Sequence, residues 1–530
     1  MTVDLIVLAT RLHGASGGAV AVQGGRIVAI GDRRDARAWT GPSTRVLDLG
    51  DATVLPGLTD AHSHPMLGAS VARGLDLRGA DSLDDVREAV ASERARLRRG
   101  EWLIGWGLDH NVWRGEEVGA AAIEAASGDV PTFLRMFDAH SAVVNRAALE
   151  RAAVRGGRRF DTGSEIVVDA SGTPTGLLLE SEALAVVERV IPPDSRADLR
   201  RRLASSLRAM AASGLTGAHV LDFKDDPADL YRALDDSGEL PLRLKIHPWV
   251  SPSSGPDDWG ALCAQVGEGG RLWRMHGVKL FLDGTIDNGT AWLRSPDSHG
   301  LSVRSTWDDP ERYRSAIAHF GAAGVGTATH AIGDRAVMHA AESIRLALQR
   351  HPGARHRIEH LELTGDDIVQ AVAASGAIAS MQPTHCTHFV TDAGTDNWSG
   401  RVGARRARHA WRTRSLVDAG TTLALGSDWP IAPFEPLQIM ADARLRRRVD
   451  RPDLPPVLRS EGLTAAQALD GYTRAAAIAA GVEHEEGAIR PGALADLTVL
   501  AADPLAVSPE EFAELPVLAT IVGGEVRHSL

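Results

Sequence analysis

Apolar, strand-like runs alternate with helical stretches through the middle of this 530-residue chain. Eight such runs occupy residues 58–61, 214–222, 240–250, 277–284, 325–334, 356–362, 376–385 and 421–430. Helical segments such as 311–323, 335–350, 366–375 and 405–419 lie between them. Strands that alternate with helices are typical of a parallel sheet, and eight repeats are the number that closes a barrel. The sequence therefore predicts an α/β fold, a (β/α)8 TIM-like barrel.

The two ends of the chain have a different character. Residues 3–54 form short strand-like runs broken by turns, with a hairpin signal at Gly24-Gly25, and residues 487–528 repeat the pattern with Gly523-Gly524. We expect residues 1–56 and 485–530 to form one composite β-sandwich domain beside a barrel domain of residues 57–484. The long excursion after the first barrel strand, about residues 70–180, is predicted to be an inserted subdomain.

The charge balance excludes some classes of partner. The chain has 57 Lys and Arg against 69 Asp and Glu, a net charge of -12, which argues against a nucleic-acid or anionic-membrane partner. Cys263 and Cys386 are far apart and lack CxxC spacing, so no disulfide framework or cysteine zinc cluster is expected. The N-terminus has no basic region before its short apolar run. We expect a cytoplasmic protein that acts on a small molecule; the sequence leaves open whether it forms a homodimer.

Side chains that can bind metal occur in the predicted strands, mostly where these end. His62 and His64 are two residues apart on the first strand, so their imidazoles share a face. Barrel enzymes place their active sites at the carboxyl ends of the strands. The full set of candidate ligands is His62, His64, Lys279, His330, His360 and Asp428.

Each candidate has a structural alternative when taken alone. His330 can cap a helix, His360 can be a hydrogen-bonded core histidine, and Asp428 can be a turn aspartate. Lys279 can direct its ammonium group toward solvent. Independent coincidences would not place one such residue in so many strands, so metal binding is the better interpretation.

Lys279 needs a separate argument because an ammonium group beside metal cations is disfavoured by desolvation and by repulsion. A lysine at this position should be neutral. A neutral amine can take up carbon dioxide and become a carbamate, which is an anionic oxygen ligand able to bridge two cations. We therefore predict that Lys279 is carbamylated.

The motifs as a set resemble the amidohydrolase superfamily. GLTDAHSHP, THAIGD, RIEH and GSDWP are similar to its metal-ligand segments, and PGALADLTVL to its terminal β-sandwich. GWGLDHNVW, DAHSAVVN, VKLFLDGT, SMQPTH and ALDGYTRAAA are similar to the branch that includes N-substituted formamide deformylases. The resemblance covers nearly the whole chain. It departs at Ala139, where relatives usually carry glycine.

The resemblance implies a division of the ligands between two metal ions. His62, His64 and Asp428 would bind the more buried ion, His330 and His360 the more exposed one, and carbamylated Lys279 would bridge them. Zn²⁺ suits imidazole and carboxylate ligands, with iron, manganese or nickel as alternatives. Some members of the superfamily use one ion, so one or two zinc ions are expected.

Such a site is predicted to cleave a C–N amide bond, as in an N-substituted formamide, by metal-activated hydroxide. Asp428 would act as general base and then as general acid. The expected substrate-binding residues are Trp106, Asp109, Trp113, His140 and His385. His140 or His385 would hydrogen-bond an oxyanion, and the two tryptophans either form an apolar slot or belong to the core of the insertion.

Two other classes of function stay open. The same metal site could hydrolyse a lactone or another ester, or deaminate a ring, because metal-activated water does not by itself distinguish C–N from C–O cleavage. The barrel could also be a non-enzymatic binding protein, although the complete ligand set argues against this. A serine hydrolase is disfavoured because the chain has no GxSxG motif.

Overall fold

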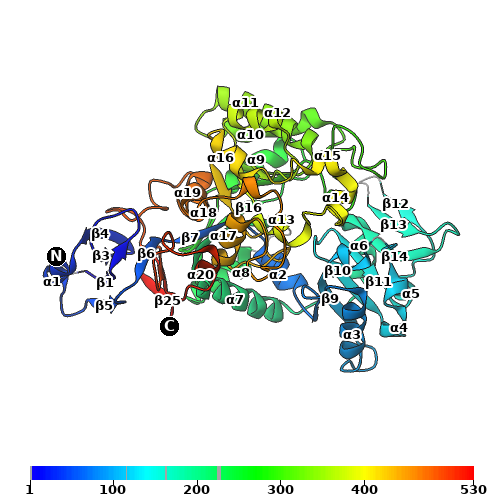
Figure 1. The fold of residues 1–530 in the computed structure, drawn as a ribbon, viewed down its shortest axis with the longest axis horizontal. Helices are drawn as coiled ribbons and strands as arrows, with labels where there is room; N and C mark the ends of the chain where they lie inside the picture. The colour runs from blue at the N-terminus through cyan, green and yellow to red at the C-terminus, as the bar shows by residue number, and fades with distance from the viewer. Residues whose placement is uncertain (1–2, 115, 161–163, 224–227) are drawn as a thin grey trace.

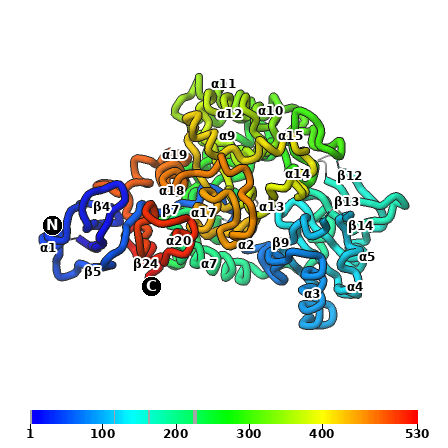
Figure 2. The backbone as a smooth tube through the Cα atoms, in the orientation of Figure 1, coloured from blue at the N-terminus to red at the C-terminus, as the bar shows by residue number. Residues whose placement is uncertain are grey.

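The computed structural model describes residues 3–114, 116–160, 164–223 and 228–530. Three regions follow one another along the long axis of the molecule (Figure 1). Strands from both termini lie at one end, an α/β region forms the centre, and the segment that follows the first central strand forms the other end. The tube in Figure 2 shows that the blue N-terminal and red C-terminal segments lie next to each other.

The central region holds a strand in each of the eight predicted runs. One sheet has the order β17-β16-β15-β7 and the other β18-β19-β20-β21-β22, and all neighbours within them are parallel. The prediction of an α/β fold with parallel strands is therefore confirmed. The strands are β7 (Leu58–Ser63), β15 (Leu215–Phe223), β16 (Arg243–Pro248), β17 (Trp273–Met275), β18 (Gly277–Phe281), β19 (Gly326–Ala331), β20 (His356–His360), β21 (Ile378–Met381) and β22 (Leu423–Leu425).

Isolated parallel bridges connect the two central sheets. Trp249, just after β16, pairs with Lys279 on β18, and Ser63 on β7 pairs with Trp429, just after β22. The carboxyl ends of β7, β18, β20 and β22 therefore lie at the same edge of the strands. This arrangement brings the histidines of distant segments together.

Amphipathic helices cover the central strands. In α11 (Asp334–Arg350) the buried residues recur every three or four positions, as in Ala336, Val337, Ala340 and Ile344. The other main helices of the region are α7 (Arg196–Ala212), α8 (Ala228–Asp236), α9 (Pro256–Gln265), α10 (Pro310–Ala322), α12 (Asp366–Ser375), α13 (Pro383–Phe389), α14 (Asn397–Val402), α16 (Thr413–Asp418), α17 (Pro436–Leu445), α18 (Ala465–Tyr472) and α19 (Arg474–Ala480). Except in α19, where Ala476 and Ala479 belong to a smaller cluster, their buried faces share one hydrophobic cluster with the strands.

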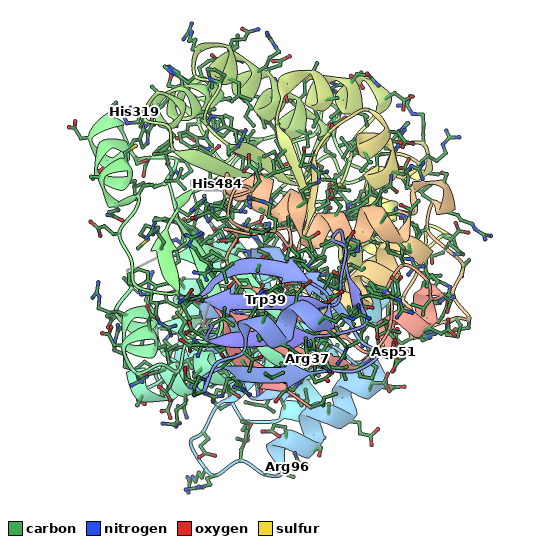
Figure 3. All side chains as sticks on the ribbon, turned by 90° about the vertical axis from the view of Figure 1, so that its left-hand side faces the viewer. Arg37, Trp39, Asp51, Arg96, His319 and His484 are labelled. Atoms are coloured by element: carbon green, nitrogen blue, oxygen red, sulfur yellow. The ribbon has the colours of Figure 1, made fainter. Side chains whose placement is uncertain are left out.

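The chain termini share a sheet. Its order is β2-β6-β23-β24-β25, and β6 pairs with β23 in antiparallel fashion, with Val54 opposite Val499. A second sheet, β4-β3-β1-β5, comes from the N-terminus alone and is at the front in Figure 3, near the labels of Arg37 and Trp39. The strands are β1 (Leu5–Leu8), β2 (Arg11–Leu12), β3 (Ala19–Gln23), β4 (Arg26–Gly31), β5 (Arg45–Asp48), β6 (Thr53–Pro56), β23 (Leu497–Leu500), β24 (Val517–Val522) and β25 (Glu525–Ser529). One hydrophobic cluster contains residues of both sheets.

Both Gly-Gly signals lie at hairpin turns. Gly24 and Gly25 have φ of 58° and 75°, and Gly523 and Gly524 have φ of 56° and 77°. Positive φ at both central positions is the backbone of a tight hairpin turn, which glycine adopts without steric cost. These pairs therefore set the register of β3 with β4 and of β24 with β25.

The third region is a seven-stranded sheet with the order β12-β13-β14-β11-β10-β9-β8. It is built from β8 (Leu75–Asp76), β9 (Leu103–Leu108), β10 (Thr132–Met136), β11 (Ser141–Val144), β12 (Arg158–Arg159), β13 (Glu165–Val168) and β14 (Pro174–Leu179). Helix α3 (Leu83–Arg94) and helix α6 (Glu180–Glu188) contribute to two separate hydrophobic clusters with this sheet. Residues 115 and 161–163 of the predicted insertion lie outside the described residues.

Among the described residues, no helix combines the length and the apolar character that crossing a bilayer requires.

Candidate metal centre

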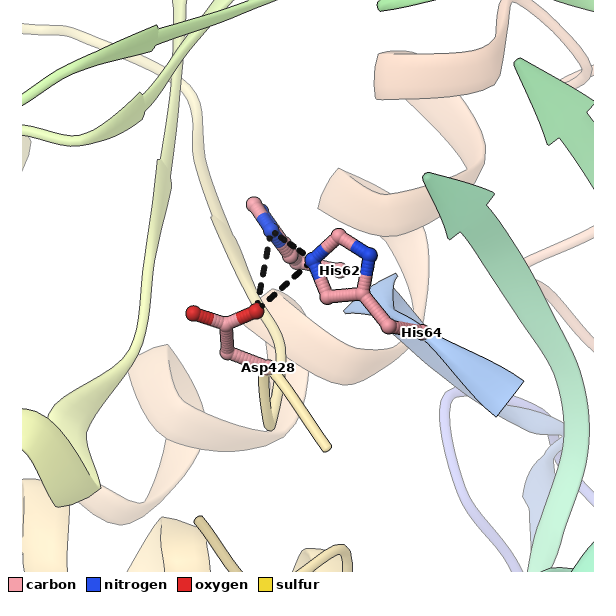
Figure 4. Close-up of side chains that lie close together, drawn as sticks. All are labelled: His62, His64 and Asp428. Carbon is pink, nitrogen blue, oxygen red and sulfur yellow. Dashed lines mark hydrogen bonds and ion pairs between the residues drawn. The ribbon is translucent and has the colours of Figure 1, made fainter. Parts of the chain in front are cut away.

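Three donor atoms converge on one point, from the end of β7, from the residue that follows it and from the loop after β22. His62 Nε2 lies 3.2 Å from His64 Nε2, and Asp428 Oδ1 lies 2.9 Å from His64 Nε2 and 3.3 Å from His62 Nε2. Figure 4 shows the three side chains directed toward one another. Backbone hydrogen bonds fix this arrangement, because Asp428 N donates to His62 O at 2.7 Å and His64 N donates to Trp429 O at 2.8 Å.

This first group suits a cation. Burial lowers the pKa of His62, so its imidazole is neutral at pH 7 and offers a lone pair. Burial raises the pKa of Asp428, but the neighbouring His62 and His64 outweigh it and hold this pKa well below its usual range. A carboxylate and imidazole lone pairs at these distances repel one another unless a cation or a proton lies between them.

A second group uses the other oxygen of the same aspartate. Asp428 Oδ2 lies 3.4 Å from His385 Nε2 and 3.9 Å from His360 Nδ1. The two imidazole rings are stacked with their centroids 5.9 Å apart. Asp428 is therefore shared by two groups of potential ligands, His62 with His64 and His360 with His385.

The structure assigns different positions to two predicted residues. His385, which we expected to bind substrate, lies among the potential ligands because α13 begins directly after β21 and turns the side chain inward. The ring of His330 lies 4.4 Å from that of His360, yet its Nε2 is 3.2 Å from the carbonyl oxygen of Gly284. His330 is thus beside the two groups and not within either of them.

Lys279 is fully buried on β18, and its Nζ has no hydrogen-bond partner among the described residues. The nitrogen lies 5.0 Å from the centre of the Phe281 ring. Burial lowers the pKa of Lys279 to about 8, against the opposing effect of Glu359 and Asp428. A partly neutral, unpartnered amine fits the chemistry of carbamate formation, which stays a prediction.

Two charged residues of the same region were not singled out from the sequence. Glu359 Oε2 lies 2.7 Å from His62 Nδ1, and Glu359 Oε1 lies 2.8 Å from Arg357 Nε. All three side chains are buried. Charged residues are rarely buried without partners. The presence of Arg357 and Glu359 in the predicted buried strand 356–362 could therefore have indicated that they contact the site.

His140 forms an ion pair at the edge of the centre. Its Nδ1 lies 2.9 Å from Glu180 Oε2, and its ring centroid lies 6.3 Å from that of His330. Burial lowers the pKa of His140, but Glu180 more than compensates and raises it to about 9. The preceding residue, Ala139, has φ of 58°, a left-handed conformation that glycine adopts more readily.

The other predicted substrate residues belong to the insertion. Trp106 packs edge-on against Trp429 with centroids 5.6 Å apart, which places it beside the Asp428 loop. Trp113 lies in the hydrophobic core of the insertion, so the structure does not bring it to the centre. Asp109 accepts a hydrogen bond from Asn111 N at 2.8 Å, and burial raises its pKa to about 6.

The insertion also contributes one ring of an aromatic pair, Phe137 with Phe389, beside the second group of potential ligands. Phe137, just after β10, stacks on Phe389 of α13 with ring centroids 3.7 Å apart, and Phe389 lies 6.1 Å from the His385 ring. Asn111 connects the same parts, because its side chain donates to Phe389 O at 3.2 Å and accepts from Asn397 N at 2.9 Å. Two aromatic rings from different regions therefore lie beside the second group of ligands.

Comparison with known proteins agrees with this architecture. The chain is 29% identical over 526 residues to a protein called putative amidohydrolase YtcJ from Bacillus subtilis (strain 168), covering 96% of this chain and 95% of the relative. It is 28% identical to the N-substituted formamide deformylase of Arthrobacter pascens, covering 96% and 94% of the two chains. The fold matches the crystal structure of an uncharacterized metal-dependent hydrolase from Pyrococcus horikoshii OT3 with a TM-score of 0.71 at 22% identity, covering 95% and 99% of the two chains.

The sequence profile of the amidohydrolase family matches residues 45–528, which include every residue of the two ligand groups. The profile begins before β6 and ends in β25, so it extends from the shared terminal sheet through the central strands and the insertion. The chain belongs to the amidohydrolase family.

Proposed function

We propose that this protein is a metal-dependent hydrolase that cleaves the C–N bond of a small, apolar amide such as an N-substituted formamide. The observation that carries the proposal is the position of Asp428, whose two oxygens face two different pairs of histidines. The substrate class is supported by the aromatic stack of Phe137 and Phe389 beside His385. It is also supported by the name of the relative from Arthrobacter pascens.

The donor set indicates which residues would hold the metal. His62, His64 and Asp428 would hold one zinc ion. His360, with His385 or His330, would hold a second ion, and carbamylated Lys279 would connect the two sites. When bound, the metal would polarise the substrate carbonyl and lower the pKa of a water molecule toward about 7.

The protein's own residues would move the protons. The Asp428 carboxylate accepts a proton from the attacking water and then donates it to the leaving nitrogen as the C–N bond breaks. The water oxygen stays on the carbonyl carbon, so the products are a carboxylic acid and an amine. His140, held as a cation by Glu180, donates a hydrogen bond to the oxygen that becomes negative during the attack.

We further propose that the central strands close into a (β/α)8 barrel with the domain limits predicted from the sequence. The two bridges, Trp249 with Lys279 and Ser63 with Trp429, support this proposal because each pairs the region of one sheet with the region of the other, as closure requires. Pairing of β6 with β23 supports a composite terminal domain. A hydrophobic cluster containing residues of both terminal sheets supports its sandwich form.

Metal analysis and a substrate panel test the function. We expect one or two zinc ions per purified chain, and hydrolysis of N-substituted formamides that is faster than hydrolysis of lactones or deamination of ring amines. Asp428→Asn is the matched control, because it keeps the side-chain size and removes the base. A protein that binds no stoichiometric transition metal would contradict the proposal and favour a non-enzymatic binding role. Faster turnover of lactones than of amides would indicate that the substrate is an ester and not an amide.

A further inference from the structure

We propose that Glu359 is a positioning residue of the metal centre, which holds His62 in the one tautomer that can bind the ion. This inference rests on the proposed function, because it requires that His62 is a ligand. Glu359 is not the last residue of its strand, β20, and its side chain would not face the substrate. It acts through the imidazole that lies between it and Asp428.

The hydrogen-bond geometry defines the tautomer. Glu359 Oε2 lies 2.7 Å from His62 Nδ1, and an ionised carboxylate only accepts hydrogen bonds, so Nδ1 carries the proton. The lone pair of the neutral ring is then on Nε2, the atom that lies 3.2 Å from His64 Nε2. With the opposite tautomer, a hydrogen would point into the group of donors.

Arg357 keeps Glu359 in place and charged. Its Nε lies 2.8 Å from Glu359 Oε1, so each carboxylate oxygen has a different partner. Arg357 is itself 1% exposed, and its other end contacts Nδ1 of buried His219. The carboxylate therefore cannot turn away from His62 without leaving a guanidinium unpaired inside the protein.

Stability alone does not account for this chain of residues. A buried ion pair contributes little net stability, because desolvation offsets the attraction, and apolar residues of the same size often serve as well. Here the pair has one member in contact with a candidate ligand, and the guanidinium charge balances the carboxylate. Carboxylates that accept from the second nitrogen of a ligand histidine fix its orientation and raise its basicity.

The test measures zinc affinity and not turnover. Metal-free wild-type protein and Glu359→Gln are titrated with Zn²⁺ in competition with a coloured chelator. We expect the Gln variant to bind the His62 ion about 10- to 100-fold more weakly, which is the usual effect of losing such a partner. Glu359→Asp, which keeps the charge on a shorter side chain, should recover part of the affinity.

Glu461→Gln is the matched control. Glu461 is also buried and also accepts from an arginine, Arg412, with Oε1 2.8 Å from Nε, but it contacts no candidate ligand. We expect this variant to lose stability without losing zinc affinity. Thermal unfolding of the metal-free proteins separates the two effects.

Several outcomes would overturn the inference. One is a Glu359→Gln variant that folds and binds zinc as tightly as the wild type, and another is a Glu461→Gln variant that weakens binding equally. If Glu359→Gln does not fold, Glu359→Asp is the variant that tests the inference. Zinc affinity equal to that of the wild type in Glu359→Asp, together with an unchanged Co²⁺ absorption spectrum, would also contradict the role. A wild-type protein that binds no zinc refutes the proposed function as well. If the wild type binds zinc and hydrolyses amides, a negative result refutes only the role of Glu359.

Discussion

His140 Nδ1 lies 2.9 Å from Glu180 Oε2, across the start of the helix that follows β14. The Glu180 carboxylate receives a second hydrogen bond from Thr290 Oγ1 at 2.9 Å, which connects the insertion to the segment after β18. The Glu180 carboxylate therefore raises the pKa of His140 and favours its cationic form at the edge of the metal centre.

This ion pair predicts the alkaline limb of the pH profile. The pKa of His140 is raised to about 9, so the cationic form is present below this pH and is lost as the pH rises through it. We expect kcat/KM to fall above a pH of about 9 in the wild type. In Glu180→Gln the limb should move toward the ordinary histidine pKa of about 6.5. Glu150→Gln, a change at an exposed carboxylate, should leave the profile in place.

The shared aspartate predicts a large loss of turnover. Asp428→Asn keeps the side-chain volume but cannot accept the proton of the attacking water, so kcat should fall by about 10²- to 10⁴-fold. Circular dichroism should show that the variant is folded. A variant with turnover close to that of the wild type would contradict the assigned role.

Removal of metal should lower the thermal stability. Without a cation, the converging donors of His62, His64 and Asp428 repel one another, and zinc at 100 times its Kd should add about 2.7 kcal/mol to the free energy of unfolding. The zinc-dependent gain should disappear in a His62→Ala/His64→Ala variant. His484→Ala, a change at an exposed histidine near the terminal sheets (Figure 3), should retain it.

Carbamylation of Lys279 can be observed directly. Protein incubated with metal and ¹³C-labelled bicarbonate should show one carbamate carbon signal, which is absent in Lys279→Met. Lys245 offers the comparison, because its Nζ is paired with Glu486 Oε2 at 2.7 Å. A signal that persists in Lys279→Met, or its absence from metal-loaded wild type, would refute the prediction.

The stacked pair of Phe137 and Phe389 predicts a change in substrate affinity. Phe389→Ala removes the partner of Phe137, and the loss of an aromatic pair is worth about 0.5–1.5 kcal/mol. We expect KM for amides with large apolar groups to rise up to about tenfold, since a factor of ten corresponds to about 1.4 kcal/mol. Small substrates such as N-methylformamide should be little affected. Equal changes in KM for large and small amides would show that this aromatic pair does not select the substrate.

Part of the centre was predictable because most of its potential ligands lie at the ends of strands or shortly after them. A strand directs residues two apart to one face, so His62 and His64 could be paired from their spacing alone. Asp428 and His360 could be added because strands in a parallel sheet end at one edge. The position of His385 beside Asp428 could not be predicted in this way, since it lies in a helix after β21 and its direction depends on how that helix packs.

The order of strands, the two Gly-Gly turns and the ligand-bearing motifs are local properties, and the sequence by itself determined them through periodicity, backbone preference and residue type. The sharing of Asp428 by two pairs of histidines required the tertiary structure. So did the contact of Glu359 with His62 and the stacking of Phe137 on Phe389, which join residues 297 and 252 positions apart. Side-chain rotation and packing between distant elements decide such contacts, and no local preference in the sequence encodes them.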